Sequence, residues 1–219
     1  MPDILQLPVQ DFLAATAAMC PTPGGGSVTA LCGALAASLA TMALRYTVGK
    51  KAYAAHDAAL KTAITELQSA SARFQELITE DIAAYEALSA MLKLPEPQRL
   101  AHPDYAATVV AAIRAPRTAA DLAAATLDHC LALRDKTSKF LISDLAIAAT
   151  YAHATVHASE FNVLINLPLL ANKGKAVIIR QNLIDLVAKA DKNYDMIRTY
   201  MRQTPWFLNP LWSLNPPTT

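Results

Sequence analysis

The sequence predicts an all-α protein, a bundle of seven or eight helices, and three observations support this fold class. Alanine dominates the 219 residues and 53% of them are hydrophobic, so the chain can bury a sizeable core. The β-branched residues are scattered and do not alternate with polar ones, so strand signals are nearly absent. Prolines and glycines divide the chain into segments of helical length. We expect one helical domain over residues 1–203 and a proline-rich, aromatic tail over residues 204–219.

The first two predicted helices are separated by a clear break. A short helix covers about residues 7–19, and the segment from Pro21 to Gly26 then interrupts the chain, because prolines break helices and glycines permit positive φ. A second helix covers about residues 27–48. The stretch from Gly24 to Leu44 is uncharged and long enough to cross a bilayer. Its small residues favour a buried core helix over a membrane span.

The later elements are predicted from the remaining breaks. They are expected over residues 54–92, 103–114, 116–134, 143–161 and 175–202, with the apolar stretch 162–168 compatible with a helix. Pro116 is expected to open the fifth helix, because proline fits the first helical turn.

A continuous seam along the third predicted helix contains one misfit. The seam follows steps of four and three through Leu60, Ile64, Leu67, Ser71, Phe74, Ile78, Asp81, Tyr85, Leu88 and Leu92. Ser71 can bond within its own helix, but a carboxylate at Asp81 is costly to bury unless it is paired, hydrogen-bonded or protonated. Either Asp81 makes a structural ion pair or helix cap, or it lies in a cleft where burial tunes its pKa. The neighbouring Glu80 fits the solvated face better.

Composition and charge exclude several classes of protein. The net charge is +1 with no basic run, which argues against nucleic-acid binding. The three cysteines lack metal-ligand spacing and are read as reduced thiols in a cytoplasmic protein. The N-terminus lacks the pattern of a signal peptide.

His153, His157 and Glu160 have the spacing of metal ligands on a helix, but they match no standard zinc motif. They are read as exposed or core-edge residues, so no metal is expected.

Three polar motifs and one glycine run each allow a structural and a functional interpretation. Ser143 and Asp144 could cap a helix or, at a helix N-terminus, bind a ligand. The pair Asn162 and Asn166, at i and i+4, could bond to backbone groups or to the polar edge of a ligand. Lys50 and Lys51 follow a helix end, where basic residues are favourable, and could also bind a substrate carboxylate. The glycines 24–26 allow either a tight helix crossing or close approach of a ligand to bare backbone.

These motifs together resemble the cyclodeaminase/cyclohydrolase family of folate enzymes. The family includes the C-terminal domain of formiminotransferase-cyclodeaminase and stand-alone bacterial methenyltetrahydrofolate cyclohydrolases. The resemblance rests on PTPGGGSV, GKKAY, EDIAAY, SDLAIAA and NVLINL, in this order between residues 21 and 167. It implies an all-helical homodimer that acts on the one-carbon bridge between N5 and N10 of tetrahydrofolate, without a metal or a separate cofactor.

The resemblance also assigns roles to residues. Asp81 falls on the family's catalytic aspartate, and Asp144 is expected to bind the pterin edge or to exchange roles with Asp81. Other motif positions are expected near the folate: Pro23, Gly24, Gly25, Gly26, Ser27, Lys50, Lys51, Tyr53, Ser143, Asn162 and Asn166. The chain departs from the family pattern at Ala83 and Ala84, where members often carry an extra acid, at Ala115, Arg117, Thr137 and Ser138, and in the tail.

Three functions follow in order of preference. Hydrolysis of the 5,10-methenyl bridge to 10-formyltetrahydrofolate ranks first, because no formiminotransferase domain accompanies the chain. Formimidoyltetrahydrofolate cyclodeamination with release of ammonia ranks second. The third is a non-catalytic helical protein that binds folate or a partner. All three place the protein in the cytoplasm, away from membrane and nucleic acid.

Overall fold

The structure is a computed structural model that describes residues 4–204. It contains the α-helices α1 (Val9–Ala17), α2 (Gly25–Arg45), α3 (Asp57–Leu92), α4 (Glu96–Ala101), α5 (Tyr105–Leu133), α6 (Ile142–Asn166) and α7 (Lys173–Gln203). Short 3-10 helices lie between them: η1 (Ile4–Gln6), η2 (Lys51–His56), η3 (Lys139–Leu141) and η4 (Leu167–Leu169). No strand occurs between residues 4 and 204, so the predicted all-α class is confirmed.

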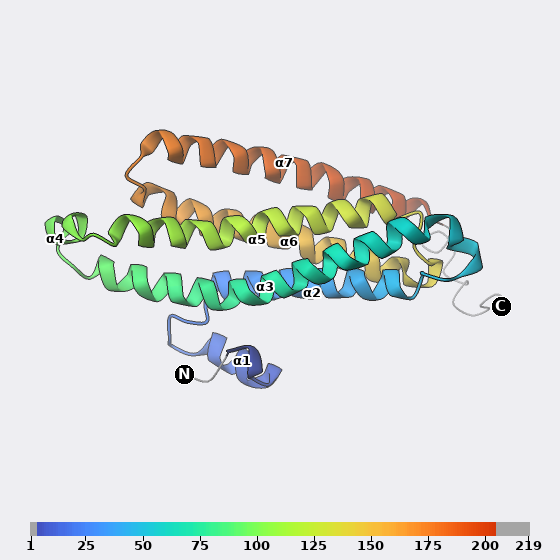
Figure 1. The fold of residues 1–219 in the computed structure, drawn as a ribbon, viewed down its shortest axis with the longest axis horizontal. Coiled ribbons are helices and arrows are strands. Elements are labelled where there is room, and N and C mark those ends of the chain that lie inside the picture. The colour runs from blue at the N-terminus through green and yellow to red at the C-terminus, as the bar shows by residue number, and fades with distance from the viewer. Residues whose placement is uncertain (1–3, 205–219) are drawn as a thin grey trace.

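Five long helices run side by side along the length of the molecule (Figure 1). In this bundle α2 packs against α3 and α6, α5 packs against α3 and α6, and α7 lies over α5 and α6. The short helix α1 lies outside the long helices, and α4 joins α3 to α5 at one end. The opposite end carries η2 and η3, so residues near Lys51 and residues near Ile142 share that end of the bundle.

Helix α2 is a core helix, as its small residues predict. It is long and apolar enough to cross a membrane by length and composition alone, and 61% of its most apolar window is buried inside the bundle. Ala36, Ala37 and Ala40 are completely buried. A Cβ atom at Gly33 would overlap the ring of Phe74 on α3, so a glycine is required where these two helices meet.

The predicted helix boundary at Pro116 is wrong. One helix, α5, runs from Tyr105 to Leu133 with Pro116 inside it. Proline has no N–H, so it leaves the carbonyl oxygen four residues earlier, on Ala112, without its helical donor. The side-chain amide of Asn166 on α6 supplies that donor, with Nδ2 3.3 Å from the Ala112 oxygen. A neighbouring helix thus stabilises a proline that the sequence pattern treats as a helix start.

Other boundaries shift in ways that matter for the motifs. Helix α6 is continuous through Asn166, so the stretch 162–168 is mostly its last turn and not a separate element. The predicted cap at Ser143 and Asp144 is also wrong, because α6 begins at Ile142 and both residues lie inside its first turn.

The hydroxyl of Ser71 bonds to Ser38 on α2 at 2.9 Å, across helices. Helix α4 was not predicted, and all of the tail except Thr204 lies outside the described residues.

Candidate active site

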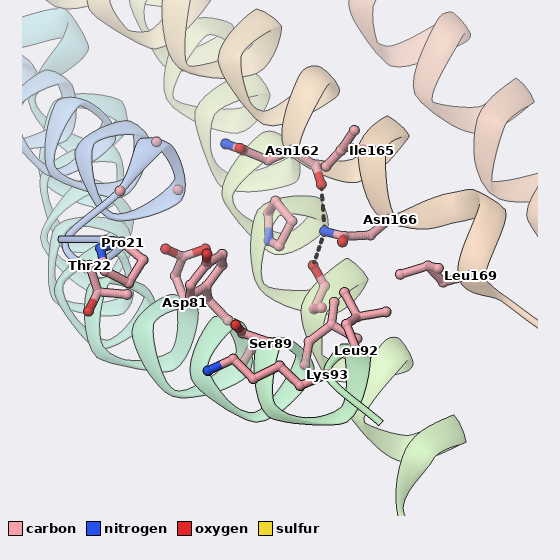
Figure 2. A pocket seen from close by; sticks show the side chains of 18 residues that line it. Pro21, Thr22, Asp81, Ser89, Leu92, Lys93, Asn162, Ile165, Asn166 and Leu169 are labelled. Carbon is pink, nitrogen blue, oxygen red and sulfur yellow. Dashed lines mark hydrogen bonds between the residues drawn. The ribbon is translucent and has the colours of Figure 1, made fainter. Parts of the chain in front are cut away.

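A cavity of about 670 Å³ opens between four helices of the bundle (Figure 2). It lies among the N-terminal end of α2, the C-terminal half of α3, the N-terminal half of α5 and the C-terminal end of α6. Its wall consists of Pro21, Thr22, Gly24, Gly25, Gly26, Asp81, Ala84, Tyr85, Leu88, Ser89, Leu92, Lys93, Ala112, Pro116, Asn162, Ile165, Asn166 and Leu169. Mostly apolar walls with a few convergent polar groups are typical of small-molecule sites of this size.

Asp81 is the half-buried carboxylate of this cavity. The hydroxyl of Ser27 donates a hydrogen bond to its Oδ2 at 3.0 Å. Burial raises the pKa of Asp81, and hydrogen bonds from the hydroxyl and backbone N–H of Ser27 oppose that rise. Asp81 therefore fits both interpretations that the seam of α3 left open: it makes no ion pair within the described residues, but it caps the first turn of α2 through Ser27 and also lies in a cleft.

The neighbouring Glu80 has a different environment. Arg73 holds its carboxylate in a two-pronged ion pair, with N–O distances of 2.6 and 3.0 Å. That hydrogen bonding lowers the pKa of Glu80. Glu80 does not line the main cavity. The two adjacent acids therefore differ as predicted: Glu80 pairs with Arg73 near the surface, whereas Asp81 lines the cavity without an ion-pair partner among the described residues.

The three glycines at the start of α2 have distinct surroundings. A Cβ atom at Gly26 would overlap the carboxylate of Asp81, so glycine at this position makes room for that side chain. A Cβ atom at Gly25 would lie 3.6 Å from Oδ1 of Asn162, an ordinary contact. Gly24 is the N-cap of α2. The first turn of α2, whose N–H groups lack helical partners, is therefore directed at the Asp81 side chain.

Asn162 and Asn166 come from the last turns of α6, on the wall facing Asp81 (Figure 2). The amide nitrogen of Asn162 lies 3.4 Å from Oγ1 of Thr29. The amide nitrogen of Asn166 bonds to the oxygens of Ala112 at 3.3 Å and of Asn162 at 3.0 Å. Both amide nitrogens thus bond to protein, which leaves the two amide oxygens as acceptors at the cavity wall.

The second half of α3 and the residue after it supply cavity residues that the sequence motifs do not include. Ser89 and Lys93 line the cavity one and two turns beyond Tyr85, and Lys93 is the one lysine or arginine lining it within residues 4–204. Tyr85 and Leu92 belong to the predicted seam, but they are 45% and 43% exposed and face the cavity. The continuation of the seam past Asp81 was the signal that could have identified this wall.

The predicted motif that contains Lys50, Lys51 and Tyr53 lies at the end of the bundle away from the cavity, near η2 and η3. Lys50 precedes η2, and its Nζ lies 3.3 Å from Oγ of Ser138. Tyr53, in η2 with Lys51, accepts a hydrogen bond from the backbone N–H of Lys139 at 3.1 Å. None of these three motif residues lines the cavity.

Ser143 and Asp144 share that far end with η2 and η3. Asp144 lies eighteen residues before Asn162 on one continuous helix, which corresponds to roughly 27 Å along its axis. Within a single chain, eight of the predicted site residues therefore lie at the cavity or next to it. They are Pro23, which is buried, and Gly24, Gly25, Gly26, Ser27, Asp81, Asn162 and Asn166. The other five predicted residues, Lys50, Lys51, Tyr53, Ser143 and Asp144, form a second group.

Comparisons with known proteins agree on one family. The profile of the formiminotransferase-cyclodeaminase family matches residues 8–184. A methenyltetrahydrofolate cyclohydrolase from Methylorubrum extorquens is 29% identical over 189 residues, which cover 83% of this chain and 89% of that enzyme. A formimidoyltransferase-cyclodeaminase from Sus scrofa is 28% identical over 191 residues, and the match covers 85% of this chain but only 35% of that longer protein.

A solved structure supports the fold. The crystal structure of formiminotetrahydrofolate cyclodeaminase from Thermotoga maritima superposes with a TM-score of 0.79 at 24% identity, covering 90% of this chain and 96% of that one. The profile match extends over most of the chain and includes all the motifs that carry the resemblance. The chain therefore belongs to the formiminotransferase-cyclodeaminase family.

Proposed function

We propose that the protein is a methenyltetrahydrofolate cyclohydrolase, which hydrolyses the 5,10-methenyl bridge to give 10-formyltetrahydrofolate. The observation that carries this proposal is the Asp81 carboxylate, half-buried and free of any ion pair within residues 4–204, on the wall of a cavity of about 670 Å³. The similarity to a cyclohydrolase over 89% of that enzyme's length supports the same reaction.

The chemistry suits a carboxylate in this position. The methenyl bridge is part of an amidinium cation, and a nearby anion stabilises that cation. Asp81 takes a proton from a water molecule as the water oxygen bonds to the bridging carbon. The bond from that carbon to N5 then breaks as N5 accepts the proton held by Asp81. The added hydroxyl loses its remaining proton to solvent, and the formyl group stays on N10. General-base help of this kind contributes about 10²–10⁴-fold to the rate.

The environment of Asp81 prepares it for this step. Burial raises its pKa, and a base whose pKa lies closer to the working pH accepts a proton more readily. The hydrogen bond from the Ser27 hydroxyl fixes the position of Oδ2, so the carboxylate is held in one orientation. No separate cofactor is needed in this scheme.

The opposite wall fits the pterin ring. The N–H and amino groups along the ring edge are donors, and the amide oxygens of Asn162 and Asn166 are acceptors at suitable places on the wall. The apolar side chains of Leu88, Ile165 and Leu169 provide surface for the aromatic rings of the substrate. Lys93, which directly follows α3 and lines the cavity, would attract a carboxylate of the glutamate tail.

We further propose that the protein is a cytoplasmic homodimer in which the second group of motif residues completes the cavity of the partner. Helix α6 carries a seam of apolar residues with alternating steps of four and three, all exposed except the partly buried Ala158: Ile147, Tyr151, Ala154, Ala158, Phe161 and Ile165. Exposed Val28 and Leu35 extend this face onto the adjacent α2. A two-fold partner packed antiparallel on this face would bring its Asp144 and Lys51 toward the cavity.

The first experiment follows the absorbance of 5,10-methenyltetrahydrofolate with wild-type protein and with Asp81→Asn, after subtraction of the uncatalysed decay. The expected result is accelerated decay with wild type and a loss of about 10²–10⁴-fold in the variant. The absence of acceleration by the wild type would contradict the proposal.

Cyclodeamination is the second candidate, favoured by the similarity to the Thermotoga maritima and Sus scrofa enzymes. The same carboxylate would move protons while N10 attacks a formimino carbon on N5 and ammonia leaves. Ammonia release from 5-formiminotetrahydrofolate, without hydrolysis of the methenyl compound, would favour it. Folate binding without turnover of either substrate would favour a non-catalytic binder.

A further inference from the structure

Three side chains outside the cavity converge on one point between α6 and α7. The Nε2 atoms of His153 and His157, one turn apart on α6, each lie 2.7 Å from the same oxygen, Oδ1 of Asp191 on α7. The two Nε2 atoms are 3.2 Å from each other. The sequence offered Glu160 as the third member of this constellation, but folding brings Asp191 there instead, from a helix distant in sequence.

Hydrogen bonding alone does not account for this triangle. If both histidines donate to Oδ1, their N–H groups face each other at 3.2 Å as two donors. If one Nε2 is deprotonated, it can accept from the other histidine but then faces the carboxylate oxygen as an acceptor at 2.7 Å. In any protonation state, two of the three contacts at most are satisfied by separate hydrogen bonds.

A metal ion satisfies all three atoms at once. Zinc binds imidazole nitrogen and carboxylate oxygen at about 2.0–2.2 Å, so the ligand atoms of a tetrahedral site lie about 3.3–3.6 Å from one another. The two Nε2 atoms, 3.2 Å apart, nearly have this spacing. Oδ1 of Asp191 is 2.7 Å from each of them, so it would move outward by roughly 0.6–0.9 Å when an ion enters. Two imidazoles and a carboxylate are also a common donor set for divalent transition metals.

The surroundings hold the rings in this orientation. His153 stacks on Tyr194 of α7, with ring centroids 4.4 Å apart and planes at 15°. The hydroxyl of Tyr194 is in turn 3.0 Å from Oγ1 of Thr150. The carboxylate of Glu160 lies 4.0 Å from Nδ1 of His157, on the side where an outer carboxylate orients a ligating imidazole.

The site is open enough for an ion to enter. The side chains of His153, His157 and Asp191 are 21%, 35% and 49% exposed. None of the three lines the main cavity, so an ion here would join α6 to α7 and leave the Asp81 chemistry unchanged.

We infer that His153, His157 and Asp191 bind one divalent transition-metal ion, with zinc the best match to their donor set, and that this ion fastens α7 to the bundle. The remaining coordination positions would be taken by water. The inference does not depend on the proposed folate reaction, because none of its residues takes part in that reaction.

The test is direct zinc binding to the full chain, freed of any histidine tag and treated with chelator. Competition of Zn²⁺ against a chromophoric chelator measures the stoichiometry and affinity, and thermal unfolding is recorded with and without Zn²⁺. The expected result is one equivalent of tightly bound zinc per chain. At a zinc concentration about 100 times Kd, Tm should rise by roughly 5–10 °C.

Two variants and a matched control locate the site. Asp191→Asn and His157→Gln should lose the bound equivalent and the Tm increase, while circular dichroism shows that they remain folded. His129→Gln removes a histidine that also pairs with a carboxylate, Glu66 at 2.9 Å, but has no second histidine beside it, so it should bind zinc like the wild type. Wild-type protein that binds no zinc, or binding that persists undiminished in Asp191→Asn, would overturn the inference. Methenyltetrahydrofolate turnover should be unaffected in all three variants.

Discussion

Gly26 at the start of α2 and Asp81 on α3 share a space that holds only one side chain. A Cβ atom at position 26 would overlap the Asp81 carboxylate, whereas at position 25 it would meet Asn162 at an ordinary 3.6 Å. The glycine run therefore has a structural reason that neither sequence interpretation named: it admits the carboxylate to the first turn of α2. The helix terminus in turn favours the ionised form of that carboxylate.

This relationship predicts opposite results for two alanine substitutions. Gly26→Ala should displace Asp81 and lower kcat by about 10²-fold, because a base misplaced by about 1 Å loses its alignment with the reacting atoms. Gly25→Ala should retain kcat and change mainly KM, since its methyl group only narrows the cavity. Steady-state kinetics with methenyltetrahydrofolate measures both, and thermal unfolding confirms that both variants are folded. Equal losses of kcat in the two variants would contradict this assignment.

The raised pKa of Asp81 predicts a pH dependence of activity. The general base must be ionised, so kcat should rise with pH through the pKa of Asp81. The midpoint should lie above the ordinary value of about 3.9 for an aspartate, because burial raises this pKa. A pH profile of kcat, corrected for uncatalysed decay at each pH, gives the midpoint. A profile that is flat down to about pH 4 would exclude a buried carboxylate as the base.

The same pKa shift has a consequence for stability. A carboxyl whose pKa is higher in the folded than in the unfolded state stabilises the fold at low pH and loses that contribution as pH rises through the folded-state pKa. Asp81→Asn lacks this titration. The Tm of the variant minus that of the wild type should therefore increase as pH rises, and parallel thermal melts of the two proteins across that range measure it. A difference that stays constant or decreases would contradict the direction of the shift.

The bond between Asn166 and Ala112 predicts a coupling with Pro116. Asn166→Leu should destabilise the fold by about 1–3 kcal/mol, because it leaves the Ala112 carbonyl without a donor. Pro116→Ala restores a backbone N–H four residues after Ala112, so the same substitution should cost less in that background. Urea unfolding of the four proteins gives the double-mutant cycle. Additive effects would show that the amide does not compensate for the proline.

The fold class and much of the cavity could be predicted from the sequence, because they depend on local patterns. The seam of α3 is one such pattern: its steps of four and three continue from Leu60 to Leu92, and a single carboxylate interrupts it. That interruption identified Asp81 without any knowledge of its partners. The resemblance to the folate enzymes likewise assigned the glycines and the two asparagines to one site, and these residues line one cavity.

What could not be predicted depends on contacts between segments distant in sequence. Pro116 is tolerated inside α5 because of Asn166, fifty residues later, and local rules assign it to a helix start. Asp191 meets the two histidines only because α7 folds back along α6. The separation of Asp144 from the cavity that holds Asp81 follows from the unbroken helix α6 between Asp144 and Asn162, whereas motif order alone says nothing about distance in space.

Lys93 is expected to bind the glutamate portion of the substrate. Lys93→Gln should raise KM by about 2–10-fold and leave kcat nearly unchanged, because a partly exposed ion pair contributes about 1 kcal/mol to binding and is not part of the reaction. Lys61→Gln is the matched control, since Lys61 lies on α3 beside Asp57 and does not line the cavity. Initial rates over a range of substrate concentrations separate the two parameters. An unchanged KM in the Lys93 variant would remove Lys93 from the binding site.

The exposed seam of α6 predicts the oligomeric state. Light scattering after size exclusion should give a mass of about twice the 23.5 kDa chain for the wild type. Phe161→Glu should shift this mass to that of a monomer, because it places a charge on an apolar face where Phe161 is 69% exposed. Val177→Glu changes an equally exposed residue of α7, at 66%, and should remain a dimer. A monomeric wild type would contradict the proposed assembly.

A mixing experiment tests whether the partner completes the cavity. Asp81→Asn and Asp144→Asn should each abolish most of the activity as separate proteins. If each site combines Asp81 of one chain with Asp144 of the other, a mixed dimer contains one site with both substitutions and one site with neither. Random exchange of equal amounts makes half of the dimers mixed, so activity should recover to about one quarter of the wild-type value. Recovery would support a shared site, whereas no recovery after verified subunit exchange would mean that both aspartates act within one chain or that Asp144 acts elsewhere.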